Sequence, residues 1–250
     1  MQNSVDAAPG RGESLPQPFP EPNATPREAA GLPPTLRLRF AAWLRVSGRL
    51  DEAARLLDEI ARQWGESAAL LDEQAALALA AGDAKAVRTR WQHRLANHPA
   101  PSARASFARA LLELGDIDDA ASIAEELLAN HGDLATVRAL AADVALLQGD
   151  LATAHEHWAP HPAEDATRIA PQLALARIAL LGGDLDEART VLGRVVADPT
   201  SLTAAQLASA ASLADLLGQP ARAQSLRIRC ARIEVARAAA LAAEIDDALG

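Results

Sequence analysis

The chain of 250 residues carries a formal net charge of −9 at pH 7, is 50% hydrophobic but only 3% aromatic, and has a single cysteine. The negative charge argues against a general nucleic-acid-binding protein, because such a protein needs a basic surface to neutralise phosphates. One cysteine excludes an internal disulfide and a zinc site built from several cysteines. No apolar run approaches the length that crosses a membrane, and the first twenty residues lack the basic start and apolar core of a signal peptide. We therefore expect a cytoplasmic protein with no membrane partner.

The N-terminal segment differs from the rest of the chain. Residues 1–32 contain six of the fifteen prolines together with glycine, serine, asparagine and acidic residues. This segment offers little apolar surface to offset the entropy lost on ordering, so we expect a disordered tail over 1–32. Two interpretations stay open: a tether or short linear motif around Phe19, or an unstructured leader with no binding role. The folded domain is expected over residues 33–250.

A short motif that starts with glycine returns at a nearly fixed spacing from residue 48 onward. Gly48-Arg-Leu-Asp-Glu-Ala53 and Gly183-Asp-Leu-Asp-Glu-Ala188 are nearly the same hexapeptide, and looser copies begin at four further glycines. The six glycines lie at positions 48, 82, 115, 149, 183 and 218, which gives steps of 33 to 35 residues. A period of this size indicates a stacked array of one supersecondary unit.

Each unit is predicted to consist of two helices joined at its glycine. The glycine follows the last apolar residue of one helix, where a left-handed cap is needed. Acidic residues such as Asp116 and Asp184 come next, where they suit the N-terminus of the following helix. The predicted helix pairs are 34–47 with 50–64, 67–81 with 83–97, 102–114 with 117–131, 134–148 with 151–159, 170–182 with 185–197, and 202–217 with 220–248.

Small residues recur on both helices of each unit. Seven residues before the glycines lie Ala41, Ala75, Ala108, Ala142, Ala176 and Ala211. Five residues after the glycines lie Ala53, Val87, Ala120, Ala154, Ala188 and Ala223. Small side chains at fixed places let two helix backbones approach closely, so both sets are predicted to lie between the paired helices. Nearby large apolar residues, such as Phe40 and Trp91, are expected to form the core.

The period near 34, the helix–turn–helix unit, the small residue of the first helix and the Gly-[Asp/Asn]-x-x-x-Ala turn resemble the tetratricopeptide repeats. The resemblance covers residues 34 to about 235 and implies an all-α fold. This fold is an α-solenoid: an open, curved, right-handed superhelix of about six helix–turn–helix repeats. The repeats depart from the family pattern, since the family's Tyr is missing and its early Trp is replaced by Arg37, Leu71, Arg104, Arg138, Gln172 and Leu207.

Two segments break the regular pattern. Pro160 and Pro162 are expected to end the second helix of the fourth unit near Trp158, with a longer loop over 160–169. The last helix runs to about residue 248 and carries five arginines, Arg222, Arg227, Arg229, Arg232 and Arg237. A charged closing helix is what the end of a repeat array needs. A basic docking surface, or a linker into a following domain, are the alternatives that the sequence leaves open.

No motif of a catalytic or cofactor site is found in the sequence. Lys85, the only lysine, belongs to no phosphate-binding loop. His155-Glu156-His157 with His161 is the one cluster that suggests a metal, but residues two apart do not share a helix face, so a solvated polar run is favoured. Cys230 lies beside arginines that would lower its pKa, yet packing as a small apolar residue against the preceding helix is favoured. We therefore predict no catalytic, metal-binding or cofactor-binding residues and no cofactor.

The first helices carry a second face, about 140° away from the face that holds the alanines. The resemblance implies that this second face lines a concave groove that binds peptides or protein segments. In the central repeats it presents leucines three residues before the glycine and alternating charges six before it. The predicted partner-binding residues are Arg109, Leu112, Asp143, Leu146, Arg177 and Leu180. The alternative is that these leucines are buried against a neighbouring repeat and that the charges pair with one another.

The expected function is a non-catalytic protein–protein interaction scaffold that holds a protein or peptide partner in this groove. One alternative is an accessory or regulatory module of a larger enzyme, for example a DNA helicase, because the last helix ends in an apolar-alternating stretch that is typical of a linker. Another is a self-associating assembly factor, a homo-oligomer formed through the ends of the stack.

Overall fold

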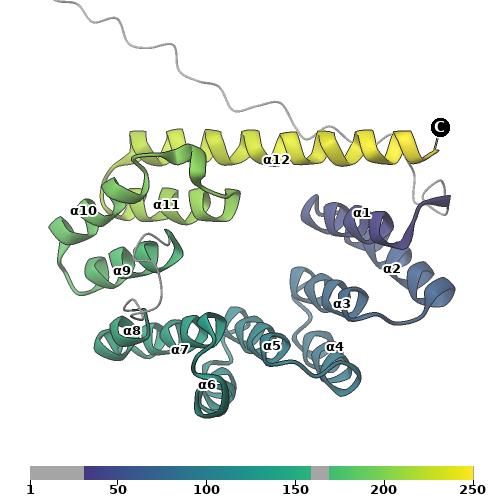
Figure 1. Cartoon of the computed structure of the whole chain (residues 1–250), viewed down its shortest axis with the longest axis horizontal. Coiled ribbons are helices and arrows are strands. Elements are labelled where there is room, and N and C mark those ends of the chain that lie inside the picture. The colour runs from purple at the N-terminus through teal and green to yellow at the C-terminus, as the bar shows by residue number, and fades with distance from the viewer. Residues whose placement is uncertain (1–30, 159–168, 250) are drawn as a thin grey trace, which may run out of the picture.

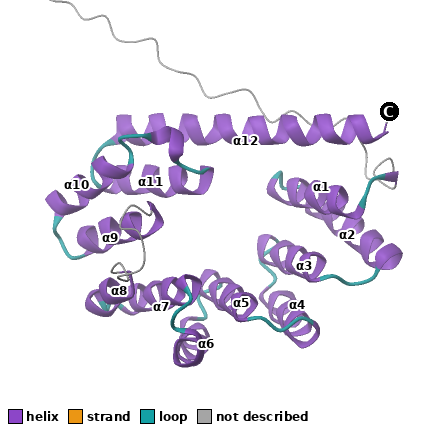
Figure 2. Cartoon of the chain, viewed as in Figure 1, coloured by secondary structure: helices purple, strands orange, loops and turns teal. Residues whose placement is uncertain are grey.

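The computed structural model describes residues 31–158 and 169–249, so the predicted tail lies outside the described residues except for its last two positions. Within those ranges the regular elements are helices and no strand occurs (Figure 2). The helices follow one another side by side around a ring (Figure 1). The all-α solenoid that the repeats predicted is confirmed.

The helices pair off in chain order, and their bounds differ from the predicted ones by at most two residues. They are α1 (Pro34–Val46), α2 (Leu50–Trp64), α3 (Ala68–Ala80), α4 (Ala84–Asn97), α5 (Pro101–Glu113), α6 (Ile117–His131), α7 (Ala135–Gln148), α8 (Leu151–Trp158), α9 (Ile169–Leu181), α10 (Leu185–Val195), α11 (Ala204–Leu216) and α12 (Pro220–Leu249). A 3₁₀ turn, η2, spans Pro199–Ser201. No helix in the described ranges is long and apolar enough to span a lipid bilayer.

Each helix pair is joined at the glycine that the repeat marks. At all six positions φ lies between 70° and 86°, the left-handed region where glycine carries no steric penalty. Asp83, Asp150 and Asp184 follow three of these glycines, and each carboxylate accepts a hydrogen bond from the backbone N–H three residues later at 2.9–3.0 Å. The predicted left-handed caps are therefore confirmed, as are the acidic N-caps at Asp150 and Asp184, whereas the side chain of Asp116 makes no capping hydrogen bond.

The paired helices form two layers. The first helices, α1, α3, α5, α7, α9 and α11, line the inside of the ring, and second helices such as α4, α6 and α10 lie outside (Figure 1). All twelve small residues that were predicted to lie between the layers are at most 2% exposed. Apolar side chains form a row of local cores around the ring rather than one central core, as a repeat array requires.

Ion pairs between the two helices of a unit lie near the position where the family pattern has its early Trp. They join a residue of the first helix to one of the second that is 22 residues further along: Arg37–Glu59, Asp72–Arg94 and Arg104–Glu126. Arg37 and Arg94 are both buried, so their charges need a partner. The same helix register therefore places a charged pair between the layers in the first three units.

The last helix joins the sixth unit to the first. α12 has 30 residues, which corresponds to about 45 Å of helix. It packs against α11 and, at its far end, against α1 (Figure 1). Leu241 and Ile245 of α12 share an apolar cluster with Leu36 of α1. Arg39 of α1 also donates hydrogen bonds to both carboxylate oxygens of Glu244, one of them at 3.2 Å.

The ends of the stack therefore meet, which differs from the open curved stack that the sequence predicted. The physical reason is that one long amphipathic helix covers both α11 and the apolar face of α1, where a linear array would leave an end uncovered. Leu32, which the sequence placed in the tail, is buried in the same cluster as Leu36. Of the three interpretations of the last helix, the closing helix agrees with this arrangement, because the far end of α12 contacts α1 instead of projecting away.

Candidate partner-binding face

The inside of the ring is hollowed between α7, α9 and α11. Leu146, Leu173, Leu213 and Leu216 form much of the apolar lining of a hollow of about 560 Å³. Its polar lining comes from Asp143, Arg177, Gln206, Ser209 and Ser212. Lining residues on α11 recur at steps of three or four, which places them on one face of that helix. The hollow is therefore apolar with a few polar groups, as sites that bind side chains are.

A second hollow of about 310 Å³ continues the first toward α5. It is lined by Arg109, Leu112, Glu113, Asp143, Leu146, Leu147 and Arg177, and it shares Asp143, Leu146 and Arg177 with the larger hollow. The two hollows thus form one continuous surface from α5 to α11. We call this surface the inner face, and its principal residues are Arg109, Leu112, Asp143, Leu146, Leu147, Arg177, Leu213 and Leu216.

Charges of alternating sign cross the inner face. Arg109 Nε lies 3.9 Å from Asp143 Oδ2, and Arg109 also donates to the carbonyl oxygen of Thr136 at 3.3 Å. Burial raises the pKa of Asp143 above its ordinary value, and the positive charges of Arg109 and Arg177 oppose that shift. Arg177 is exposed and makes no hydrogen bond or ion pair within the described part of the chain. The inner face therefore presents one carboxylate between two guanidinium groups, and of these only that of Arg109 forms an ion pair with it.

Five of the six predicted partner-binding residues line the inner face, and Leu180 does not. Leu180 packs against the apolar cluster formed by α9, α10, α11 and α12. Leu112 and Leu146 are half-buried and pack against local cores while they also line the hollows. The contact between Arg109 and Asp143 is the charge pairing that the alternative interpretation expected. Partner binding by the five lining residues stays a prediction.

The predicted partner-binding residues leave out the leucines one position further along. Leu147, Leu181 and Leu216, each two residues before its glycine, are 49%, 54% and 70% exposed. Leu147 and Leu216 line the hollows. The signal was present in the doublets Leu146-Leu147 and Leu180-Leu181, because a step of one residue turns the side chain by 100° and so brings the second leucine out of the core.

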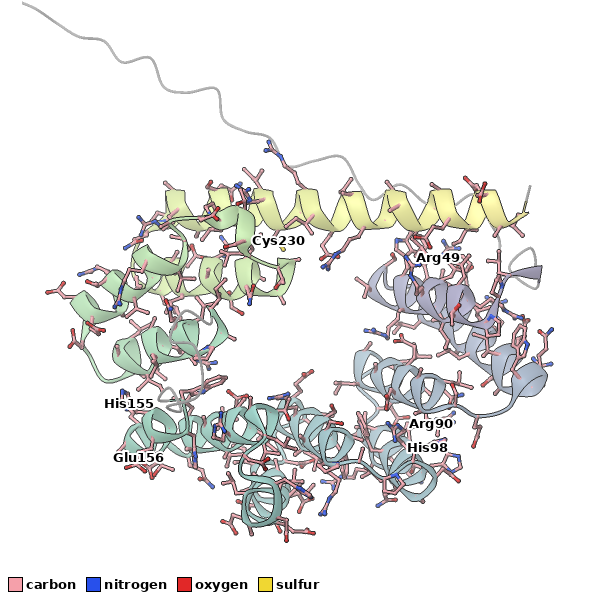
Figure 3. The ribbon with its side chains drawn as sticks, in the orientation of Figure 1. Arg49, Arg90, His98, His155, Glu156 and Cys230 are labelled. Carbon is pink, nitrogen blue, oxygen red and sulfur yellow. The ribbon has the colours of Figure 1, made fainter. Side chains whose placement is uncertain are left out.

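The histidines that the sequence analysis considered as metal ligands lie away from the inner face. His155 and Glu156 lie on α8 at the outer edge of the ring (Figure 3). His161 falls outside the described residues. Among the residues that the structure does describe, no group of three or more His, Cys, Asp or Glu side chains is placed to hold a metal ion.

Cys230 packs against the preceding helix, as the favoured interpretation of the sequence predicted. It lies on α12 beside α11 (Figure 3), and its Sγ donates to the carbonyl oxygen of Ala204 at 3.3 Å. Burial raises the pKa of the Cys230 thiol, and the nearby charge of Glu234 raises it further. The thiol is therefore held in its protonated form at neutral pH, which is the opposite of what a reactive cysteine needs.

Comparison with known proteins identifies the fold. The chain is similar to TTC0263, a thermophilic TPR protein in Thermus thermophilus, with a TM-score of 0.59 and 20% identity over 74% of this chain and 99% of that one. It is similar to PilW, a widely conserved type IV pilus biogenesis factor, with a TM-score of 0.55 and 14% identity over 77% and 90%. It is also similar to Pseudomonas aeruginosa PilF, with a TM-score of 0.52 and 15% identity over 80% and 90%. No family model and no curated protein sequence matches the chain. The resemblance to the tetratricopeptide repeats is confirmed at the level of the fold.

Proposed function

We propose that this tetratricopeptide-repeat fold, closed into a ring, is a non-catalytic scaffold that binds a segment of a partner protein on its inner face. The observation that supports this proposal most is the exposure of Leu147 and Leu216 beside two connected hollows. Large apolar side chains that stay in water next to a concave, partly polar surface mark interaction sites.

The larger hollow fits apolar side chains of a protein segment. Its volume of about 560 Å³ lies within the range of roughly 300–1,000 Å³ that is typical of binding pockets. Leu213 and Leu216 supply the apolar contact on α11, and Ser209 supplies a hydroxyl for the backbone or side chain of the segment. Arg177 favours an acidic residue at the junction of the two hollows, because the nearby carboxylate of Asp143 is already contacted by Arg109. The partner segment is therefore apolar with at least one acidic residue.

Two substitutions on the inner face test the proposal. Leu147→Asp and Leu216→Asp place a charge where the segment would bury an apolar side chain. Both leucines are exposed, so the fold tolerates the change, whereas Leu146 is partly packed in a local core and is a less suitable target. Truncation of a hot-spot residue in an interface costs about 2 kcal/mol or more, so each variant should lower the affinity for an inner-face partner by roughly thirtyfold or more.

Leu185→Asp is the matched control, because Leu185 is an exposed leucine at the start of the outer helix α10. Affinity capture from a lysate of the native cells, quantified by mass spectrometry, compares the four proteins after circular dichroism has shown equal helix content. We expect a set of proteins that the unmodified chain and the control capture and that both inner-face variants lose. Capture of the same proteins in equal amounts by all four would rule out the inner face as the binding surface.

A further inference from the structure

α12 is anchored at two places, with a stretch between them in which no side chain is fully buried. Ala223 and Leu226 belong to the apolar cluster of the last units, and Leu241 and Ile245 belong to that of the first unit. Between Ile228 and Ala238 no residue is buried. Cys230 and Ile233 still pack against the first cluster, so α12 leaves α11 after Ile233 and reaches α1 at Leu241, eight residues or about 12 Å of helix further along. Figure 1 shows the same arrangement, with α12 running from α11 to α1.

The stretch of α12 between the two clusters has no built-in hinge. Residues 221–249 contain neither glycine nor proline, the residues at which helices bend sharply. A change in the shape of the ring therefore cannot come from a fold in the middle of α12. It has to come from release of one end.

The end that rests on α1 is the weaker of the two. Its large buried side chains are Leu241 and Ile245, whereas the N-terminal part of α12 packs along α11 as the second helix of its own unit. The ion pair that joins the far end to α1, Arg39 with Glu244, is 55% and 50% exposed, so water and salt screen it. The Cys230 hydrogen bond to Ala204 adds a polar contact on the α11 side. Release at α1 is therefore the opening that costs least.

We propose that the contact between α1 and the C-terminal part of α12 is a latch, and that its release opens the ring and admits a partner chain to the inner face. Release separates Leu241 and Ile245 from α1 while the N-terminal part of α12 stays on α11. The second half of this proposal rests on the proposed function. A segment that lies within a long chain, or between folded domains, has no free end to thread, so it reaches the inside of a closed ring sideways through such an opening.

Hydrogen exchange of the full chain tests the latch without any partner. We expect the amides of residues 238–249 to exchange faster than those of 223–230, through an opening that leaves α11 protected. Glu244→Arg places two arginines opposite each other and should speed exchange of 238–249 by about threefold or more. The double variant Arg39→Glu/Glu244→Arg restores a pair of opposite charges and should return exchange to its original rate. Both side chains are exposed, so neither variant endangers the fold.

Glu126→Arg is the control, since it disrupts an exposed ion pair of similar type between α5 and α6. It should leave exchange of 238–249 unchanged. Exchange of 238–249 that matches 223–230 and ignores Glu244→Arg would overturn the latch, because the two halves of α12 would then open together. Fast exchange of 238–249 that is insensitive to the charge pair would also overturn it, because that end would not be docked on α1.

A ring whose α1 and α12 are cross-linked tests whether release of the latch is needed to admit a partner. In a Cys230→Ala background, Arg39→Cys with Glu244→Cys allows a short bismaleimide to join α1 to α12. The locked ring should show slow exchange of 238–249 and should fail to capture the proteins whose capture depends on Leu216. Equal capture by locked and unlocked rings would overturn the gating role and leave the inner face in place. If no captured protein depends on Leu216, the proposed function fails, and the exchange experiment still decides whether the latch opens.

Discussion

Replacement of Glu59 by Gln tests how the chain accommodates an arginine where the tetratricopeptide repeats carry a tryptophan. Arg37 is only 1% exposed. Its guanidinium donates to Glu59 at 3.0 Å and to Gln63 at 2.8 Å, and it lies 4.8 Å from the ring centroid of Trp64. Its Nε has no hydrogen-bond partner among the described residues. Burial lowers the pKa of Arg37 and Glu59 opposes this shift, so Glu59 is the group that compensates the buried charge.

The expected loss in the free energy of unfolding follows from the burial of Arg37 and Glu59. Removal of one partner of a buried ion pair costs about 3–5 kcal/mol, because the other charge is left buried without compensation. The Glu59 side chain is 38% exposed, so water already screens part of its attraction and the cost falls toward or below the lower limit. Glu59→Gln keeps the size of the side chain and an acceptor oxygen. We therefore expect the free energy of unfolding to fall by about 2–3 kcal/mol.

Glu126→Gln is the matched control, because Arg104 and Glu126 occupy the same register two units later but are both exposed. Urea unfolding at pH 7, followed by far-ultraviolet circular dichroism, compares the two variants with the unmodified chain. The midpoint should fall clearly for Glu59→Gln and stay unchanged for Glu126→Gln. Equal midpoints for the two variants would refute the reasoning, since the buried arginine would then be compensated by something other than the Glu59 carboxylate.

Asp143 and two glycines provide the remaining predictions. Burial raises the pKa of Asp143, so the folded chain holds the Asp143 proton more tightly than the unfolded chain does. The stability that this proton contributes is complete below the unfolded pKa of about 3.9 and is lost as the pH rises through the pKa of the folded state. Asp143→Asn should therefore gain stability over the unmodified chain at pH 7 and gain less near pH 3.5, as measured by urea midpoints; a gain that does not change with pH would contradict this. Gly149 has a φ of 81°, so Gly149→Ala should lower the free energy of unfolding by about 1–2 kcal/mol. Gly193 lies inside α10 with open space around it, so Gly193→Ala should raise the free energy of unfolding by about 0.5–1 kcal/mol. Melting temperatures that shift in the same direction for both glycine variants would contradict the assignment of the repeat glycines as left-handed caps.

The helices, their caps and the small residues between them could be predicted because they depend on local chemistry that the repeat displays six times. Gly183 and Asp184 define a cap from two adjacent residues, and Ala176 and Ala188 define the close approach of two helices within one unit. Each such contact joins residues fewer than 35 apart. Repetition at a fixed spacing then separates these positions from chance occurrences of the same residue types.

Ring closure could not be predicted from the same pattern. The pair of Arg39 and Glu244 joins residues that are 205 positions apart, and it depends on the sum of small rotations between successive units. No single unit shows that sum in its sequence. The unusual length of the last helix was visible, but its amphipathic end fits a linker as well as a clamp on α1.

The sequence analysis placed the inner face on the correct helices, but its predicted leucines lie one residue away from the most exposed ones. Leu180 and Leu181 are equally apolar, and the direction of their side chains depends on how the end of α9 is tilted against α10 and α11. The periodicity of a helix fixes which residues share a face only to within about one position. The sequence therefore located the face and its charges and showed the leucine doublets, whereas the structure was needed to tell which leucine of each doublet is exposed.

Closure of the ring links the stability of the first unit to access to the inner face. A linear repeat array frays from its ends, because an end unit has a neighbour on one side only. In the closed ring α1 has α12 on the side where a preceding unit would stack, so Leu36 and Phe40 are covered on both sides. Release of the latch removes that cover, so the first unit loses support at the moment when the inside of the ring becomes accessible. A partner that binds the inner face and also covers α1 would offset this loss. A partner that only fills the hollow near α11 would leave the first unit frayed, and would therefore favour closure of the ring around the bound partner.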